Sequence, residues 1–396
     1  MISQKDYSIK EIIQMDACTD CTVCVDVCPC VAATGDGKLS GRYRIDRLRK
    51  IMRARSPFLK IFFGDKLLSL EQMKEFSETV FRCTLCGRCQ ESCPSGILLR
   101  DLWLSLRSDL VNSNSYPPKI DRIAHNVAKS HNVFDEDNAE RADWVEDMRD
   151  PPDDNYIRKK SEVVYFTGCV SAYFPMAQGI PIALAGIFDS SGVDFTLLGE
   201  DEWCCGFPLL GAGLQDQFQN LIAHNVEAVK SKGARDIVFA CPSCYQMWRE
   251  HYPPEFNIYH VTQYLEKLLD TGRLHMKELP MTVTYHDPCD LGRSAGEYLA
   301  PRKLIRAVPG IRLVEMAHNR ENCLCCGGGG NLEMIDAGLS ADIAKSKIEE
   351  IIKTGAEAVV TACQQCVRTM TSHIRKNKIQ LEVLDIVQLI QRATGK

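Results

Sequence analysis

Ten of the twenty cysteines form two copies of one five-cysteine pattern, and thiolates gathered in such numbers favour soft metals or iron–sulfur clusters. Each copy has a single cysteine, an adjacent pair followed by glycine, and then a C-x-x-C. The first copy comprises Cys169, Cys204, Cys205, Cys241 and Cys244. The second comprises Cys289, Cys325, Cys326, Cys363 and Cys366, offset from the first by 120 to 122 positions. Five thiols exceed what a tetrahedral zinc or a cubane cluster needs. The pattern suits a site in which one sulfur bridges two irons; one Zn(Cys)4 per repeat with a spare cysteine is the alternative.

A second cysteine system precedes the repeats. Two runs have the spacing C-x2-C-x2-C-x3-C-P, which is typical of two-cluster ferredoxins. In that arrangement the fourth cysteine of each run binds the cluster of the other run. The first predicted cubane [4Fe–4S] cluster therefore takes Cys18, Cys21, Cys24 and Cys93. The second takes Cys83, Cys86, Cys89 and Cys28. A pair of zinc knuckles is the alternative interpretation.

Several polar residues near these motifs have no assigned role. Eighteen predicted ligands leave Cys30 and Cys323 over, and a buried bystander is the simpler interpretation of Cys323. His286 and Asp287, which precede Cys289, could deliver a proton near a cluster, or they could be a structural polar pair at the end of the strand. The run 327–330 is all glycine but lacks the residues of a phosphate loop, so we expect it to allow a close backbone approach to the cluster.

The elements that position the N-terminal cysteines are predicted to be helical. More than fifty residues separate the two runs, and apolar residues at spacings of three and four predict helices at "RYRIDRLRKIM" and "LEQMKEFSETVF". Between positions 38 and 60 there are nine Lys or Arg residues and one acid. This basic stripe is interpreted as a solvated helix face, with docking of an acidic redox partner as the alternative.

Each repeat alternates strands and helices. "SEVVYFTGC" and "ARDIVFAC" predict two buried parallel strands of the first repeat, and "MTVTYHDPC" and "AEAVVTAC" predict those of the second. A helix that ends in glycine precedes the second strand of each pair. The cysteines thus follow the carboxyl ends of parallel strands, where open α/β sheets place their sites.

The predicted fold class is α/β plus helical: a helical ferredoxin-type domain followed by two α/β domains that pack as a pseudo-twofold pair. The predicted boundaries are 1–112 for the cluster domain, 113–160 for a connector, and 161–280 and 281–396 for the two repeats. The connector is strongly acidic, with ten acids among the twenty residues 135–154, and is expected to be exposed with short helices.

Composition excludes several classes. The formal charge of −5 argues against nucleic acid as a partner. No apolar run is long enough to span a bilayer, and no secretory signal is visible. Twenty cysteines without an export signal indicate metal or redox chemistry in the cytoplasm, with peripheral membrane association through a partner left open.

The repeats, and above all "YHDPCDLGR" and "NRENCLCCGGGG", resemble the CCG domains of heterodisulfide reductase. A helical two-cluster domain fused ahead of two CCG domains is similar to the D subunit of that enzyme, over nearly the whole chain. The resemblance implies a non-cubane [4Fe–4S] cluster in each five-cysteine set, with the ten repeat cysteines as the catalytic residues.

Two functions follow from this resemblance. In the first, electrons pass from the cubane clusters to the non-cubane pair, which reduces or forms a disulfide bond. In the second, the chain is a relay subunit of a flavin-dependent glycerol-3-phosphate, glycolate or lactate dehydrogenase. Because no flavin or nicotinamide fingerprint is visible, we expect a flavoprotein or a membrane cytochrome b-type subunit as partner, and anaerobic metabolism as the setting.

Overall fold

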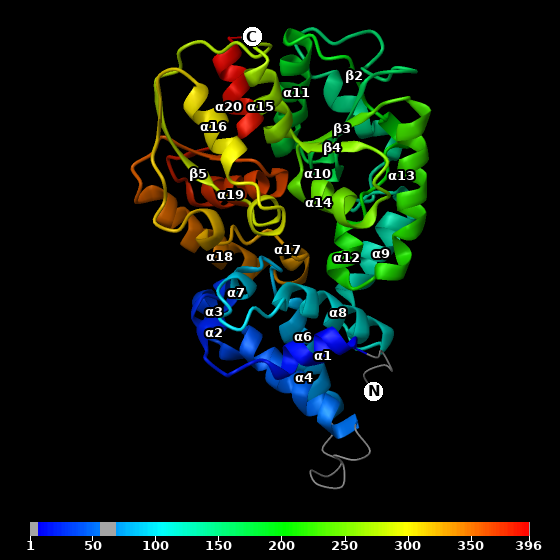
Figure 1. Ribbon diagram of the computed structural model, residues 1–396, viewed down its shortest axis with the longest axis vertical. Helices are drawn as coiled ribbons and strands as arrows, with labels where there is room; N and C mark the ends of the chain where they lie inside the picture. Colours follow the sequence, from blue (N-terminus) through cyan, green and yellow to red (C-terminus); the bar gives the residue numbers. More distant parts are fainter. Residues whose placement is uncertain (1–6, 56–68, 396) are drawn as a thin grey trace. The chain divides into compact units, whose positions relative to one another are not determined.

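The computed structural model describes residues 7–55 and 69–395 (Figure 1). These residues form two compact units. The N-terminal unit comprises residues up to 123 together with 208–215 and 327–346. The repeat unit comprises 124–207, 216–326 and 347–396. The predicted domain boundaries stay a prediction, but the N-terminal unit already includes a short segment from each repeat.

The N-terminal unit is helical, as predicted. Two of its helices begin at a capping box, in which Ser8 or Ser69 pairs with the residue three positions on. Short helical turns carry the cysteines between the longer helices. The helices are α1 (Ile9–Asp16), α2 (Val23–Asp26), α3 (Pro29–Thr34), α4 (Gly41–Arg55), α6 (Leu70–Phe81), α7 (Arg88–Glu91) and α8 (Leu99–Asn112), with a 3-10 turn η1 (Gly37–Leu39).

The basic stripe is only partly a solvated face. Arg44 is 2% exposed and donates to the carbonyl of Thr79 at 2.8 Å. Arg49 donates to main-chain carbonyls, including that of Cys18 at 2.7 Å. The side chains of Arg53 and Arg55, and Lys60, lie outside the described residues. Apolar spacing alone could not identify Arg44, because a buried and a solvated arginine look the same in the sequence.

The repeat unit contains two four-stranded parallel sheets, ordered β2-β1-β3-β4 and β6-β5-β7-β8. The four predicted strands are the central pair of each sheet, and each sheet has two further strands that the sequence analysis missed. The missed strands are short or start at exposed polar residues. The strands are β1 (Val163–Phe166), β2 (Phe195–Thr196), β3 (Asp236–Phe239), β4 (Asn257–His260), β5 (Met281–His286), β6 (Ile311–Leu313), β7 (Ala358–Thr361) and β8 (Glu382–Asp385).

Helices connect the strands of both sheets. The helices that precede β3 and β7 are each followed by a glycine in the left-handed conformation, as predicted (Gly233 and Gly355). The first repeat contains α10 (Cys169–Tyr173), α11 (Pro175–Ser190), α12 (Phe207–Ala212), α13 (Gln219–Ser231), α14 (Pro242–His251) and α15 (Val261–Asp270), with 3-10 turns η3 (Gly199–Asp201) and η4 (Gln215–Gln217). The second contains a π-helical turn η5 (Asp290–Ser294), α16 (Leu299–Ala307), a 3-10 turn η6 (Arg320–Asn322), α17 (Leu332–Ile335), α18 (Ala337–Ile352), α19 (Gln364–Asn377) and α20 (Ile386–Thr394).

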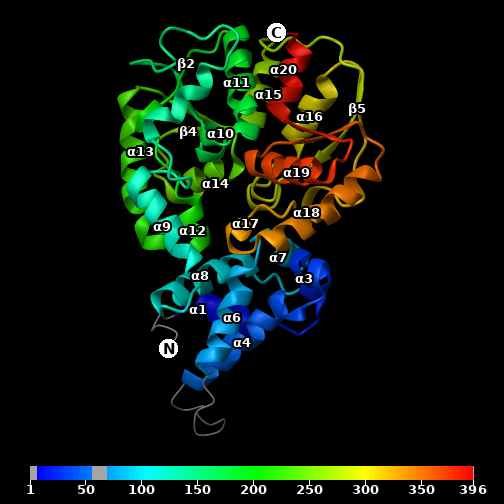
Figure 2. The same cartoon turned by 180° about the vertical axis from the view of Figure 1, so that it is seen from behind.

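The two repeats pack as the predicted pseudo-twofold pair. Helix α11 packs against α20, and α16 packs against α15 (Figures 1 and 2). The second contact is equivalent to the first, because α16 and α15 hold the positions in their repeats that α11 and α20 hold in theirs. One apolar core runs through both repeats and contains Leu184 and Ile187 of α11 with Ile386 and Ile390 of α20. Burial of this shared core fixes the two sheets relative to each other.

The acidic connector contains helices, as predicted, but some of its side chains are buried. It contains α9 (Lys119–Ser130) and a 3-10 segment η2 (Asn138–Val145). Trp144 and Val145 are buried in the shared core of the repeats, and Arg141 is also buried. The acids therefore cover the outside of a segment whose apolar side chains belong to the repeat unit.

None of the helices in the described ranges is long and apolar enough to cross a membrane.

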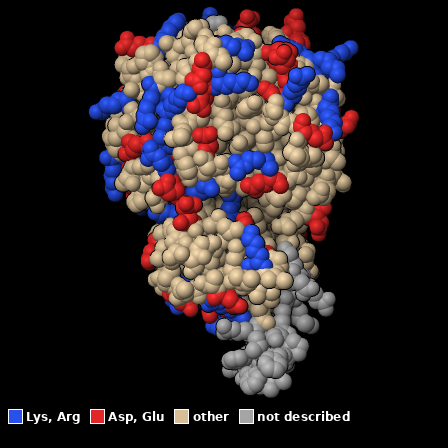
Figure 3. Space-filling view, viewed as in Figure 1, with Lys and Arg blue, Asp and Glu red and all other residues tan. Residues whose placement is uncertain are grey.

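On the face that Figure 3 displays, acidic and basic side chains are interspersed.

We predict that Gly213→Ala is strongly destabilising. Gly213 has φ +83°, and a Cβ there would lie 2.5 Å from the carbonyl carbon of Arg107, which cannot move aside. We expect a loss of more than about 3 kcal/mol, from backbone strain and overpacking together. The measurement is the urea midpoint of the anaerobically purified chain.

Gly272→Ala is the matched control. Gly272 also has a positive φ, +68°, but a Cβ there would meet nothing within 4 Å. Strain alone should cost about 1 kcal/mol. Equal shifts for the two variants would contradict the steric account of Gly213.

Candidate metal centres

Two cavities in the N-terminal unit are each lined by four of the predicted cubane ligands. One is lined by Cys18, Cys21, Cys24 and Cys93. The other is lined by Cys28, Cys83, Cys86 and Cys89, together with Cys30. Each cavity combines three cysteines of one run with the fourth cysteine of the other. The structure thus brings together the same two sets of four cysteines that the ferredoxin-type spacing predicts.

The same local backbone builds both runs. Two residues in each C-x2-C-x2-C turn have positive φ, at corresponding positions: Asp20 and Thr22 in the first run, Leu85 and Gly87 in the second. Positive φ at non-glycine residues is strained, and it persists where the surroundings fix it. The short helices α2 and α7 follow these turns, so three cysteines of each run point to one side.

Two buried arginines near the second cavity show whether its residues fit an iron–sulfur cluster. Arg44 and Arg107 are 2% and 0% exposed, and no carboxylate among the described residues forms an ion pair with either. Burial acts to lower the pKa of Arg44, but the nearby thiolates, Cys83 first among them, raise it more. A buried cation needs a compensating anion. Four thiolates that hold an iron–sulfur cluster supply that negative charge, so the residues fit the group.

The thiols of the first five-cysteine set are joined by hydrogen bonds, and all five cysteines are buried. A hydrogen bond with Cys204, together with burial, raises the pKa of Cys169. Hydrogen bonds with Cys204 and Cys244 lower the pKa of Cys205 to about 6. Hydrogen bonds with Cys205 and Cys241, and burial, raise the pKa of Cys244. The five thiols therefore form one contiguous group at the carboxyl ends of β1 and β3.

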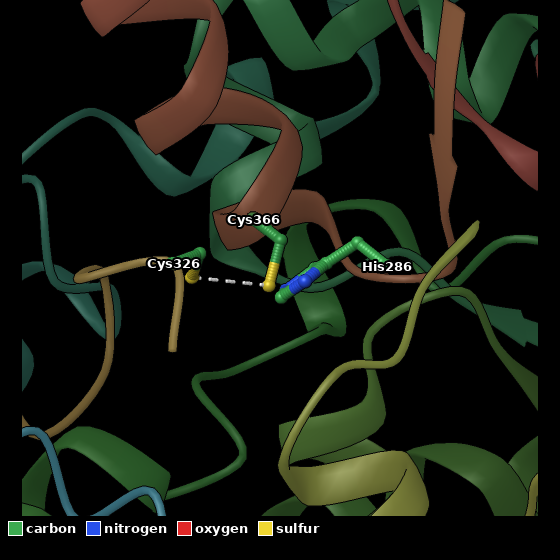
Figure 4. Close-up of side chains that lie close together, drawn as sticks. All are labelled: His286, Cys326 and Cys366. Carbon is green, nitrogen blue, oxygen red and sulfur yellow. Dashed lines mark hydrogen bonds between the residues drawn. The ribbon is translucent and has the colours of Figure 1, made fainter. Parts of the chain in front are cut away.

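The second set is arranged around the start of α19. The Sγ atoms of Cys326 and Cys366 lie 3.3 Å apart, and Cys363 Sγ accepts the main-chain N–H of Cys366 at 3.4 Å. His286 lies next to them, with a ring nitrogen within 4.8 Å of both sulfurs (Figure 4). Cys289 begins the turn after β5, and Cys325 precedes Cys326 in the chain.

The two sets meet across the interface between the repeats. Ser243, inside the first C-x-x-C, donates to Asp290 at 2.6 Å, and Gln364, inside the second, donates to the carbonyl of Thr167 at 3.0 Å. A hydrogen bond with Cys366 acts to lower the pKa of Cys363, but burial and the negative charge of Cys241 outweigh it. The C-x-x-C segments of the two repeats therefore lie close to each other.

A buried ion pair adjoins the first set. Arg141 Nη1 lies 2.7 Å from Glu202 Oε1, and both side chains are 1% exposed. The Glu202 carboxylate also accepts the main-chain N–H groups of Thr167 and Gly168 at 2.7 and 2.8 Å. Arg141 Nη2 reaches Cys169 Sγ at 3.7 Å. Sequence analysis missed both partners, although Glu202 holds the position in the first repeat that Cys323 holds in the second.

A different polar network adjoins the second set. Cys323 is buried, as predicted, but its Sγ lies 3.4 Å from His286 Nδ1 and 3.5 Å from Lys347 Nζ. Burial acts to raise the pKa of Cys323, but Lys347 and His286 bring it down to about 7. Lys347 is paired with Glu350 at 2.8 Å, and Glu350 lies 2.7 Å from Nδ1 of the half-exposed His318. Cys323 is therefore part of a charged network and not an inert bystander.

His286 and Asp287 have different partners in the structure. Asp287 forms a two-point ion pair with Arg302 at 2.7 and 2.9 Å and accepts the main-chain N–H of Arg320. The Asp287 carboxylate therefore fixes the turn after β5, while His286 is directed to Cys323 and Cys366.

We predict that Glu202→Gln destabilises the chain by about 3–5 kcal/mol, because it removes the carboxylate that pairs with the buried charge of Arg141. The urea midpoint of the anaerobically purified variant measures the effect. Glu200→Gln, at an exposed residue two positions earlier, is the control and should stay within about 0.5 kcal/mol of the native chain. A Glu202→Gln midpoint equal to that of the control would show that the pair does not stabilise the fold.

Comparison with family models matches three segments of this chain. The 4Fe-4S dicluster domain matches residues 14–97, and the cysteine-rich domain CCG matches 163–249 and 283–371. The N-terminal region accordingly holds two [4Fe–4S] clusters, and the two cysteine-rich domains fit non-cubane iron–sulfur clusters.

Curated relatives cover the whole chain. The D subunit of the dihydromethanophenazine:CoB–CoM heterodisulfide reductase of Methanosarcina acetivorans is 34% identical over 100% of this chain and 97% of that protein. The corresponding protein of Methanosarcina barkeri is 33% identical with the same coverage. The EtfAB:quinone oxidoreductase of Syntrophomonas wolfei is 26% identical over 98% of this chain and 59% of that protein. The resemblance seen in the sequence is confirmed, and the chain belongs to the family of iron–sulfur oxidoreductases formed by the D subunits of heterodisulfide reductase.

Proposed function

We propose that this chain is the iron–sulfur subunit of a cytoplasmic or peripherally membrane-bound complex and that it reduces a disulfide between its two CCG domains. The observation that carries the proposal is the juxtaposition of the two C-x-x-C segments across the pseudo-twofold interface. Two similar sites that face each other suit a substrate whose two reacting atoms are alike, as the two sulfurs of a disulfide are.

Eighteen cysteines are proposed to hold the clusters. The two cavities of the N-terminal unit supply four ligands each, and the two five-cysteine sets supply the rest. When bound, the clusters provide one-electron transfer. The balanced reaction takes up two electrons and two protons, breaks one S–S bond and yields two thiols. In the reverse direction the same residues would form the disulfide.

The surrounding residues of this chain support the site. Arg141 and Lys347 place one buried cation near each five-cysteine set, where it favours negatively charged sulfur. The network from Lys347 through Glu350 ends at the half-exposed His318. The ion pairs with Glu202 and Glu350 hold both cations in position.

A relay without its own substrate is the second candidate. The observation that favours it is the 26% identity to the EtfAB:quinone oxidoreductase of Syntrophomonas wolfei, in an alignment that covers 98% of this chain. In that case a flavoprotein supplies the electrons and another subunit accepts them. A flavoprotein or a membrane cytochrome b-type subunit is the proposed partner for either function.

A disulfide assay separates the two functions. Reduced methyl viologen would be the donor, and a panel of small-molecule disulfides, symmetric and mixed, would be the substrates. We expect viologen oxidation with two thiols released per two electrons consumed. Viologen that remains reduced with every disulfide, in protein that carries its full iron, would leave only the relay function.

Iron analysis tests the ligands. Four [4Fe–4S] clusters predict about sixteen irons per chain. Cys86→Ser should remove about four of them, because it deletes one proposed ligand of a four-cysteine set. Cys30→Ser is the matched control, since Cys30 is a buried neighbour of Cys28 outside the proposed sets. About eight irons with added zinc, or equal iron loss in the two variants, would contradict the assignment.

A further inference from the structure

Arg107 is a buried arginine that joins three separate segments of the N-terminal unit. Its Nη1 donates to the carbonyl of Gly211 at 2.5 Å and to that of Gly330 at 2.9 Å. Its Nη2 donates to the carbonyl of Cys83 at 2.8 Å. Gly211 lies six residues after Cys205, and Gly330 lies four residues after Cys326. One guanidinium group therefore connects the Cys83 loop to the segment that follows each C-C-G.

Glycines make this junction close. A Cβ on Gly330 would lie 2.3 Å from the carbonyl oxygen of Cys83, and one on Gly329 would lie 2.6 Å from that of Thr84. The four-glycine run was expected to approach a cluster, and it packs directly on the loop of a proposed cubane ligand. Asn331 Nδ2 also donates to the carbonyl of Pro208 at 2.9 Å, so the two post-C-C-G segments are bonded to each other as well.

The charge of Arg107 links the junction to the cubane site. Its bonded partners are neutral main-chain carbonyls, and they include those of Val80 and Phe81. Among the residues that the structure describes, no carboxylate pairs with it, and the thiol groups whose negative charge favours its charged form are those of Cys83 and Cys30. Hydrogen-bonded, close-packed backbone is a good medium for electron transfer, and here it joins the Cys83 loop to the two segments that follow the C-C-G motifs in the chain.

We propose that Arg107 is a positioning residue that makes the Cys83 site a branch point, from which the two five-cysteine sites receive electrons in parallel. The alternative is a series arrangement, in which one repeat is reduced only through the other. The proposal rests on the cluster ligands proposed above but not on a disulfide substrate.

Cluster reduction in the full-length chain tests the branch. Anaerobically purified protein is mixed with methyl viologen radical, which is oxidised to the dication as it passes one electron to an iron–sulfur site. The EPR signals of the centres are followed by freeze-quenching. Two double variants each disable one repeat: Cys204→Ser with Cys205→Ser, and Cys325→Ser with Cys326→Ser. The parallel arrangement predicts that the remaining five-cysteine site is reduced at the native rate in both variants.

A loss of rate on the order of tenfold in one of these variants would overturn the proposal, because only a series path makes one repeat depend on the other. Neither result depends on disulfide turnover, so a failed branch and a failed reductase are distinguishable.

Arg107 itself is tested by Arg107→Gln and Arg107→Lys. Arg107→Gln should slow the reduction of both five-cysteine sites by the same factor. It should also lower the midpoint potential of the Cys83 site, since it removes a nearby positive charge. Arg107→Lys should restore the midpoint potential of the Cys83 site, because lysine keeps the positive charge. It should restore the reduction rates only in part, because lysine lacks the planar guanidinium group that donates to two segments at once. An Arg107→Gln protein with native iron content that slows one site alone, or neither, would contradict the role of Arg107. If Arg107→Gln does not retain iron, the two double variants decide the question.

Discussion

Buried sulfur and its charge are the constraint on which the rest of this structure depends. Many thiols converge from segments far apart in the sequence, and most of them are shielded from water. Thiolates in such places need neighbouring positive charge, because desolvation disfavours the charged form. Arg44, Arg107, Arg141 and Lys347 supply it, and each is nearly or completely buried. These cations are therefore explained by the sites they adjoin, and not by the surface charge of the chain.

The repeats share an architecture but not an environment. The sheets have the same strand order, and two equivalent helix–helix contacts cross the interface. At matched positions, however, Phe166 of the first repeat corresponds to His286, and Glu202 corresponds to Cys323. The first site therefore has a fixed ion pair beside it, whereas the second has a chain of polar groups that extends to a half-exposed histidine. Two sites with the same cysteine pattern can thus differ in charge and in access to protons.

The segments after each C-C-G connect the two kinds of site. Residues 208–215 and 327–346 come from the repeats in sequence but belong to the compact unit of the N-terminal helices. Positive φ at Gly213 and Gly330, and the lack of a Cβ at Gly329, allow their backbones to touch Arg107 and the Cys83 loop. A boundary drawn along the chain cannot represent such an exchange, since each repeat contributes residues to both units.

The sequence alone determined the cysteine sets, the helical cluster domain, the central strands and the pseudo-twofold pair. Spacing was sufficient because a C-x2-C-x2-C turn and a strand that ends in cysteine are local features with local causes. Tertiary structure decided which charges the thiols meet: the burial of Arg44, the pairing of Arg141 with Glu202, the turn of His286 toward Cys323, and the bonds of Arg107. These partners lie tens to hundreds of residues apart. The charge of an arginine or glutamate is the same in any sequence context, and only folding determines whether water or a thiolate surrounds it.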